Sequence, residues 1–422
     1  MSSTMKSTRR DLLKSTGLLI GGTAVIGTGL AEIAVTAEPL ARALLPYLQN
    51  PAPDGISICF LAREATDVAV LWAEGNEKLE AEAEAEAEPQ EIPNTPWTRW
   101  KVRLSGLKPG TMYRYQVRFS DAGDQQKSEI YRFTTLDPKA AETKVAVFND
   151  IHDQRETIAA VMRKVKPDDF HFTIFNGDMI NDPSAADGAR KVFELWNYYV
   201  GLLEGHSKPI LFVRGNHEVR GSFKEHLRFL FDLPDLTADQ KPEDQQWQFE
   251  LAAGPVHFVI MDTGEDDGPE TPQDSYKRPK FWQAYRKRQA AWLGELVQSK
   301  SGHEKPWRIF VSHIPLHNPA GWFSVSSRDD WNPLLMDYGV SLMLAGHDHS
   351  WKFLPGGQSF KIAGKSNLED SPAFPVLIGG GPAMNQGTVM LVHADSTQLT
   401  TRMFHTSGKL LTSFSTKKTL GS

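Results

Sequence analysis

Hydrophobic and polar positions alternate along the first part of the chain, between about residues 50 and 137. Residues 97–104 and 113–119 place an apolar or aromatic side chain at every second position, which is typical of strands with one buried face. Shorter apolar runs at 56–61, 68–72 and 131–135 have the same strand-like composition, and turn residues separate them. The pattern predicts an all-β sandwich over residues 50–137.

From residue 143 the pattern changes to apolar runs of strand length that alternate with helical patterns. We predict strands at 144–148, 170–176, 208–213, 255–261, 307–311 and 340–344, and helices at 157–166, 185–203 and 281–299. From 374 to about 415 strands follow one another. This order predicts an α/β (α+β) domain over residues 143–405 in four layers, two mixed sheets flanked by helices, with a C-terminal hairpin or tail at 406–422.

Two kinds of segment interrupt these patterns. Residues 80–88 alternate Glu and Ala, and because both residues are poor strand formers we predict a solvated acidic loop there. Residues 264–280 and 318–331 are rich in turn residues, and we predict loops of the kind that shape pockets. By contrast, the apolar stripe of the helix at 281–299 is expected in the core.

Composition narrows the chemistry. The chain is 40% hydrophobic and 23% charged, with a formal net charge of -6, which does not suggest a nucleic-acid-binding surface. Cys59 is the only cysteine, so an intrachain disulfide and a thiolate metal cluster are both excluded. Any metal ion must therefore be held by oxygen and imidazole nitrogen.

The first 37 residues resemble a twin-arginine signal peptide. Arg9 and Arg10 precede a small, apolar run at 17–31, and Ala37 offers a cleavage point. This predicts the twin-arginine export machinery as a partner, a periplasmic or secreted location, and no stable membrane span after cleavage. The alternative is a retained transmembrane anchor, which the shortness and glycine content of the run disfavour.

Polar motifs follow five of the predicted strands in the second domain. In chain order they are Asp150-x-His152, Gly177-Asp178, Gly215-Asn216-His217-Glu218, His313 and Gly346-His347-x-His349. Open α/β sheets bind ligands at the carboxyl ends of their strands, so we expect these side chains to meet. Carboxylate, amide and imidazole donors suit zinc, manganese or iron and argue against a calcium site.

Through these five motifs, residues 143–405 resemble the calcineurin-like metallophosphoesterase superfamily. The sandwich in front, together with Gln289-x-x-Trp292-Leu293 and the Gly215-to-Glu218 motif, is similar to the purple acid phosphatase branch. The corner at residues 107–115 resembles the tyrosine corner of fibronectin type III-like sandwiches. The resemblance thus covers nearly the whole chain after residue 37.

The resemblance implies two divalent or mixed-valence metal ions (Fe, Mn or Zn). One would be held by Asp150, His152, Asp178 and His349, and the other by Asp178, Asn216, His313 and His347. His217 would protonate the leaving alkoxide or hold a phosphate oxygen, a task suited to imidazole. Glu218 or Asp348 would orient ligand histidines. Four further side chains lie near the motifs and are candidates for substrate contact: His317, Arg155, Arg214 and Arg220.

Two positions depart from the purple enzymes. Asn181 stands where they carry a tyrosine whose phenolate on ferric iron gives the colour, and His152 stands where they have glycine. The resemblance therefore implies a colourless site with no requirement for ferric iron.

The sequence as a whole predicts an exported dinuclear phosphoesterase that acts on a small-molecule phosphate monoester by attack of a metal-bound hydroxide. A phosphodiesterase acting on cyclic nucleotides or phospholipid-like esters remains an alternative with the same ligands. An inactive surface-binding protein, in which the front sandwich does the work, is an alternative of another class. The complete set of ligand positions argues against it.

Overall fold

The computed structural model describes residues 43–79, 84–234, 245–267, 278–321, 323–363 and 369–418. These residues all belong to one compact unit, Leu40–Ser422. The predicted signal peptide lies outside the described residues. Within the described ranges, no helix is long and apolar enough to cross a membrane.

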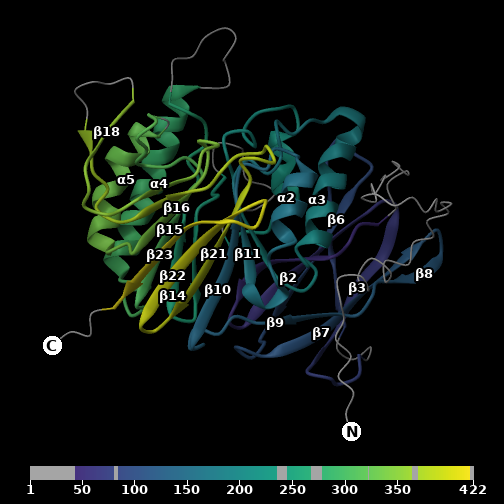
Figure 1. Cartoon of the computed structure of the whole chain (residues 1–422). Coiled ribbons are helices and arrows are strands. Elements are labelled where there is room, and N and C mark those ends of the chain that lie inside the picture. Colours follow the sequence, from purple (N-terminus) through teal and green to yellow (C-terminus); the bar gives the residue numbers. More distant parts are fainter. Residues whose placement is uncertain are drawn as a thin grey trace, which may run out of the picture. The chain divides into compact units, whose positions relative to one another are not determined.

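The first domain is a sandwich of two antiparallel sheets (Figure 1). One sheet has the order β1-β2-β6-β5, and the other has the order β4-β3-β7-β8, with β9 also paired to β7. Apolar side chains from both sheets, such as Ile58 and Val117, form its core, so the predicted all-β domain is confirmed. The strands are β1 (Tyr47–Ala52), β2 (Gly55–Ala62), β3 (Ala65–Glu74), β4 (Glu84–Glu86), β5 (Glu88–Glu91), β6 (Thr98–Ser105), β7 (Met112–Asp121), β8 (Asp124–Lys127) and β9 (Tyr131–Thr134).

The Glu- and Ala-rich segment at residues 80–88 is not entirely a loop. Residues 80–83 lie outside the described residues, but β4 pairs with β3 and β5 pairs with β6. Both are edge strands, where the backbone is hydrogen-bonded on one side while Glu88, Pro89 and Glu91 stay exposed. An edge position tolerates both charge and proline, and this is why the poor strand propensity is overridden.

The predicted tyrosine corner is present in the first domain. The backbone N–H of Lys108 donates to the Tyr113 hydroxyl oxygen at 2.9 Å. The ring of Tyr113 stacks on Phe133 of β9, with centroids 5.6 Å apart. The corner therefore ties the turn before β7 to the core of the sandwich.

The second domain contains two six-stranded mixed sheets. The first has the order β12-β11-β10-β21-β22-β23 and the second the order β13-β14-β15-β16-β20-β17. The first sheet comprises β10 (Glu142–Phe148), β11 (Phe172–Asn176), β12 (Ile210–Val213), β21 (Thr388–Asp395), β22 (Gln398–His405) and β23 (Leu410–Lys417). The second comprises β13 (Phe249–Ala253), β14 (Val256–Ile260), β15 (Trp307–Val311), β16 (Leu342–Ala345), β17 (Lys352–Leu354) and β20 (Val376–Ile378). A short pair, β18 (Phe360–Lys361) and β19 (Glu369–Asp370), stands apart from both.

Helices cover the outer faces of both sheets, as Figure 1 shows. On the first sheet, Phe175 packs edge-on against Trp196 and Tyr199 of α3. On the second, Phe310 contacts Trp331 of α5. The four long helices are α2 (Arg155–Met162), α3 (Arg190–Leu202), α4 (Pro279–Ser299) and α5 (Val325–Tyr338).

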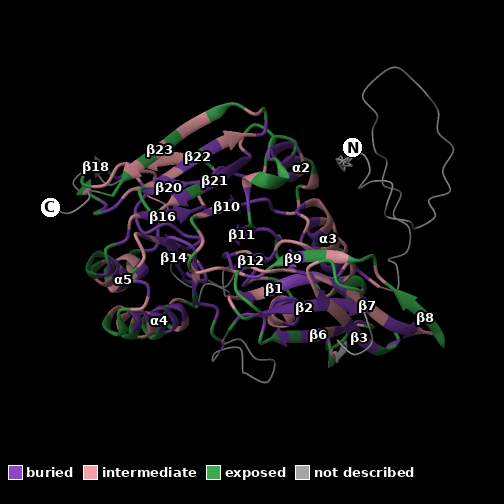
Figure 2. Cartoon of the chain, turned by 90° about the horizontal axis from the view of Figure 1, so that it is seen from below, coloured by how far each residue is buried: buried purple, intermediate pink, exposed green. Residues whose placement is uncertain are grey.

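Between the sheets, Phe172 of β11 meets Phe258 of β14 with ring centroids 5.7 Å apart. The central strands of both sheets, such as β10, β11, β14 and β15, are largely buried, whereas β23 at one edge and helices α4 and α5 have mixed surfaces (Figure 2). The predicted four-layer fold is therefore confirmed.

Helix α5 corrects the prediction of a loop over residues 318–331. Its first turn is capped by Ser324, whose hydroxyl oxygen accepts from the Ser327 N–H at 3.2 Å. Trp331, Leu335 and Tyr338 are buried in the cluster that also contains residues of α4 and β15. Tertiary packing, rather than local pattern, stabilises this proline-containing helix. Trp322, which we expected in that loop, lies outside the described residues.

The first domain contacts the second through β1. The backbone N–H of Leu48 donates to the Gly205 carbonyl oxygen at 2.9 Å, and Gln49 Nε2 donates to the Ile210 carbonyl oxygen at 2.6 Å. Ile210 is the first residue of β12. Strand β1 thus lies against β12, an edge strand of the first sheet.

Asp232 joins the two domains by charge. One of its carboxylate oxygens lies 3.3 Å from Arg99 Nη2, and the other accepts from the Ser57 hydroxyl at 2.5 Å. Both Asp232 and Arg99 are buried. Burial raises the pKa of Asp232, but Arg99 and Ser57 outweigh burial and lower it overall.

Replacing Asp232 by Asn is expected to lower the free energy of unfolding by about 3 kcal/mol near neutral pH, because Arg99 is left buried without its counter-charge. The folded-state pKa lies below the unfolded value of about 3.9. The contribution of the carboxylate is therefore present above about pH 4 and is lost as the pH falls through the folded-state pKa. Chemical denaturation at several pH values measures this. If the difference in free energy of unfolding between wild type and variant does not decrease towards about pH 3, the prediction is contradicted.

Candidate metal centre

The predicted site residues meet where five strands from the two sheets end. Asn176, at the end of β11, joins the sheets at this edge, because its amide donates to the carbonyl oxygens of Ser312 at 3.1 Å and Leu344 at 3.3 Å. The motifs directly follow β10 (Asp150, His152), β11 (Asp178), β12 (Asn216, His217), β15 (His313) and β16 (His347, His349).

The structure brings the predicted ligands into two groups that share Asp178. The first group is Asp150, His152, Asp178 and His349, and the second is Asp178, His313 and His347, with ligand atoms in each group within 4.8 Å of one another. Asn216 joins the second group, because its Oδ1 lies 3.1 Å from His313 Nε2 and 3.0 Å from His347 Nδ1. These are the two sets that the resemblance implies.

The arrangement of donor atoms fits a cation in the first group. His152 Nε2 and His349 Nε2 face each other at 2.9 Å. Asp150 Oδ1 is buried without a hydrogen-bond partner and lies 3.4 Å from His349 Nε2. A buried carboxylate oxygen is costly unless it is paired or ligates a metal ion. The residues therefore fit a bound ion, and their oxygen and nitrogen donors suit Zn, Mn or Fe.

The second group fits a cation in one orientation of the Asn216 amide. With Oδ1 towards His313 and His347, three ligand residues and Asp178 converge on one point. Turned by 180°, the amide would donate to Asp178 Oδ2 at 3.2 Å and accept from Arg220 Nη2 at 2.9 Å. A cation favours the first orientation, because it needs the amide oxygen.

The electrostatics of the two groups keep the carboxylates charged. Burial raises the pKa values of Asp150 and Asp178, but the charge of His313 and neighbouring hydrogen bonds outweigh burial, so both pKa values lie well below the usual range. In the same way, the two carboxylates outweigh burial and raise the pKa of His152 to about 9 and that of His313 to about 10. The site is an environment that favours positive charge.

The backbone around the site is strained. Five of the predicted ligands have positive φ, a conformation that costs non-glycine residues free energy and is concentrated at functional sites: Asp150, His152, Asp178, His347 and His349. Glycine is required beside them. A Cβ on Gly177, whose φ is +80°, would lie 2.3 Å from His313 Nδ1, and one on Gly346 would lie 2.4 Å from Asp150 Oδ2.

His217 stands beside both groups without joining either. Its backbone N–H donates to Asp178 Oδ1 at 2.9 Å, and its ring lies edge-on to His152, with centroids 4.6 Å apart. Its Nδ1 is 2.9 Å from Asp182 Oδ1. Burial lowers the pKa of His217. Asp182 was not predicted, although a carboxylate in the turn after Asp178 is a usable sequence signal.

Glu218 supports the site in a different way from the one expected. We predicted that it orients a ligand histidine. Instead, its carboxylate accepts from the backbone N–H groups of Asp178, Met179, Ile180 and Gly215 at 2.8–2.9 Å. It therefore holds the turn that carries Asp178. Burial and the charge of Asp178 raise its pKa, and the N–H donors oppose that rise.

Four of the candidate residues have partners outside the two ligand groups. Asp348 pairs with Lys352 rather than with a histidine. His317 is buried, with Nδ1 2.9 Å from Asp370 Oδ2. Arg214 is buried and paired with Asp262, and Arg155 lies over the ring of Tyr198. Arg220 does reach the site, with its Nη1 3.3 Å from His217 Nε2.

Asn181 contacts His152. Asn181 Oδ1 lies 3.2 Å from His152 Nδ1. An acceptor at Nδ1 places the ring proton there and leaves the Nε2 lone pair directed at the first group. Asn181 therefore orients a histidine of the first group.

Each of the two domains matches a known protein family. Residues 143–351 match the family described as "Calcineurin-like phosphoesterase", and residues 46–135 match "Purple acid Phosphatase, N-terminal domain". The chain therefore combines a calcineurin-like phosphoesterase domain with a purple acid phosphatase N-terminal domain, as the motifs predict.

The curated relatives narrow the class to the purple acid phosphatase branch. The chain is similar to purple acid phosphatase 15 of Arabidopsis thaliana, with 23% identity over 332 residues, covering 70% of this chain and 55% of the relative. It is also similar to human acid phosphatase type 7, with 24% identity over 273 residues, covering 60% of this chain and 56% of the relative. The chain thus spans about half the length of the curated relatives it matches.

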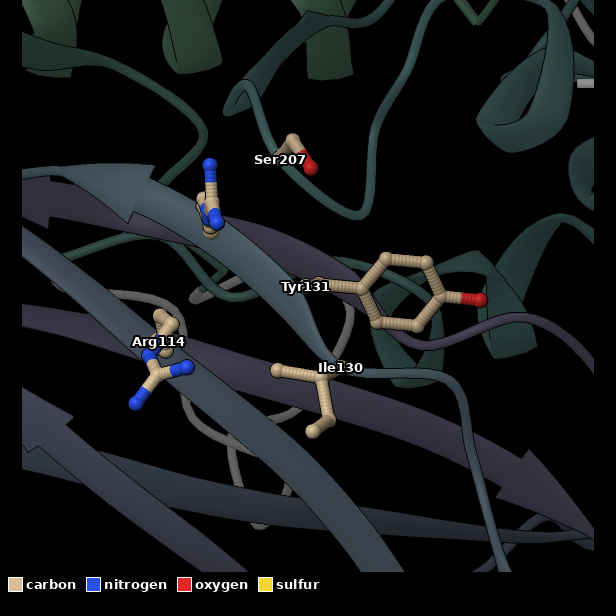
Figure 3. A pocket seen from close by; sticks show the side chains of 5 residues that line it. Arg114, Ile130, Tyr131 and Ser207 are labelled. Atoms are coloured by element: carbon tan, nitrogen blue, oxygen red, sulfur yellow. The ribbon is translucent and has the colours of Figure 1, made fainter. Parts of the chain in front are cut away.

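A separate surface pocket of about 450 Å³ lies on the first domain (Figure 3). Arg114 from β7 and Tyr131 and Arg132 from β9 line it, together with Ile130 and Ser207. None of these is a predicted site residue. Four of the lining residues belong to the sandwich, and Ser207 belongs to the segment between α3 and β12 of the second domain.

Replacing Asn181 by Ala is expected to weaken binding of a cation to the first group about tenfold, because His152 loses the acceptor that orients it. Calorimetric titration of metal-stripped protein measures the change. Asn181→Asp, which keeps an acceptor at the same place, is the matched control. Equal affinities in wild type and Asn181→Ala would show that Asn181 has no such function.

Proposed function

We propose that this chain is a dinuclear metal-dependent phosphoesterase that hydrolyses phosphate monoesters. The observation that carries the proposal is the pair of ligand groups sharing the buried carboxylate of Asp178. Cations bound there would supply Lewis acidity and an activated water. The relatives named acid phosphatases support a phosphate ester as substrate.

The side chains of this chain provide acid–base chemistry next to the two groups. His217 is partly exposed, and its Nδ1 is held by Asp182. With a proton on Nδ1 shared with that carboxylate, the ring is oriented so that Nε2 can exchange a proton with a leaving alkoxide. Arg220, beside Nε2, adds positive charge where a phosphate oxygen would lie.

We further propose export by the twin-arginine route, followed by function in the periplasm or outside the cell. The Arg9-Arg10 pair and the apolar run after it support this. The single cysteine also agrees, because Cys59 is buried and the fold needs no oxidation to form. Fusion of residues 1–37 to a folded reporter, with Arg9 and Arg10 changed to Lys as control, tests it.

Replacing Asp178 by Asn is expected to abolish the dinuclear centre, because the shared carboxylate loses its charge. Wild-type protein purified without added metal should hold about two metal ions per chain, and the variant fewer. Release of phosphate from p-nitrophenyl phosphate and from its bis-ester should be lost together. The ester that the wild type prefers decides between monoester and diester hydrolysis. Absence of metal and of hydrolysis after adding Mn²⁺, Zn²⁺ or iron would overturn the proposal.

Replacing His217 by Asn is expected to lower kcat by about 100-fold or more, as for loss of a general acid, while the bound metal stays unchanged. Asp182→Asn should produce a smaller decrease, because the ring stays but loses its orienting carboxylate. Elemental analysis and steady-state kinetics on the same samples separate the two effects. Loss of metal from His217→Asn would show that this residue is a ligand instead.

A further inference from the structure

Residues 262–267, which follow β14, run beside the second group. We call residues 262–267 the acidic loop, since Asp262, Glu265, Asp266 and Asp267 lie in it. The proposed chemistry uses none of the four. Asp262, Glu265 and Asp267 each pair with an arginine side chain. Asp266 instead contacts a predicted metal ligand.

The beginning of the acidic loop is fixed by α4 and by β12. Asp262 is fully buried, and one carboxylate oxygen accepts from Arg214 Nη2 at 2.6 Å and from the Tyr285 hydroxyl at 2.7 Å. Gln289 binds the backbone of Asp262 on both sides, accepting from its N–H at 3.0 Å and donating to its carbonyl at 2.6 Å. The loop therefore leaves β14 in one defined direction.

The rest of the loop is fixed by Arg286, which is buried. Its guanidinium donates to the carbonyl oxygen of Thr263 at 2.9 Å, to that of Glu265, and to Asp267. One side chain of α4 thus contacts three successive parts of the loop. Because the backbone is held in this way, the side chains of Glu265 and Asp266 are presented to the site at defined positions.

Asp266 contacts a predicted ligand directly. Its Oδ1 lies 2.9 Å from His347 Nε2, while His347 Nδ1 faces the second group, 3.0 Å from Asn216 Oδ1. A carboxylate at Nε2 places the ring proton there. The Nδ1 lone pair is then free to ligate.

Glu265 connects the same loop to Arg220. Its buried carboxylate forms two hydrogen bonds with Arg220, at 2.7 and 2.6 Å. Arg220 in turn stands next to His217 Nε2. Neighbouring residues of one fixed loop therefore reach both the second group and the proposed general acid.

We propose that the acidic loop is a positioning element, in which Asp266 sets the tautomer and orientation of His347 as a ligand through Nδ1. The inference rests on the proposed function only in taking His347 as a ligand. The competing account is an ion pair that stabilises the fold and leaves cation binding unaffected. The two accounts differ in what happens to the second cation when Asp266 is changed.

The test is calorimetric titration of metal-stripped protein with Mn²⁺ and with Zn²⁺. Asp266→Ala is expected to weaken binding of one of the two cations about 10- to 100-fold and to leave the other unchanged. Asp266→Asn keeps an acceptor and should restore part of the loss. Asp267→Asn is the matched control, because it perturbs the same loop without touching His347, and it should bind both cations as the wild type does.

A second measurement keeps the proposal testable if Asp266→Ala fails to fold. In ¹⁵N-histidine-labelled, metal-stripped wild type, one ring more than in metal-stripped Asp266→Leu, which has no acceptor, should show the spectrum of a proton held on Nε2. Unchanged affinities in both Asp266 variants, equal loss in Asp267→Asn, or identical imidazole spectra would each overturn the proposal. None of these readouts uses ester hydrolysis, so two-site binding without hydrolysis would refute only the proposed function.

Discussion

The burial of two carboxylates, Asp150 and Asp178, is the constraint on which this structure depends. Neither is more than 1% exposed, and one oxygen of Asp150 has no hydrogen-bond partner. Isolated charges in such surroundings are expensive, and imidazoles alone offset them only when protonated. The surrounding donors converge on points that positive ions would fill. The ends of five strands and the turns that follow them are arranged around that requirement.

Meeting this requirement determines much of the backbone geometry. Two sheets must bring their carboxyl edges together, and Asn176 joins them there through the carbonyls of Ser312 and Leu344. Five ligands then adopt left-handed backbone conformations, supported by contacts such as those of Glu218 with four N–H groups. This strain is carried by the folded scaffold, which holds the donor atoms at defined positions.

The sequence was sufficient to predict those structural elements that are determined by a local pattern of residues. Buried strands followed by Asp, Asn or His predicted which side chains meet at this edge of the sheets, because a motif at a strand end implies where its side chain lies. Asp266 and the four donors to Glu218 were not predictable, since they depend on how a distant loop folds back. Helix α5 and edge strands β4 and β5 were missed for a related reason, because packing and backbone pairing override weak local propensity.

The contact between β1 and β12 has a consequence for how the two domains can be separated. Strand β12 ends the order of the first sheet, and an uncovered strand of this kind offers its backbone for pairing with other chains. The front sandwich shields it, with Leu48 and Gln49 bonded to the backbone at Gly205 and Ile210. The sandwich therefore keeps the backbone of β12 from pairing with other chains. The phosphoesterase domain cut free at the linker would expose this sheet edge to other chains, although all residues of the two ligand groups lie within that domain.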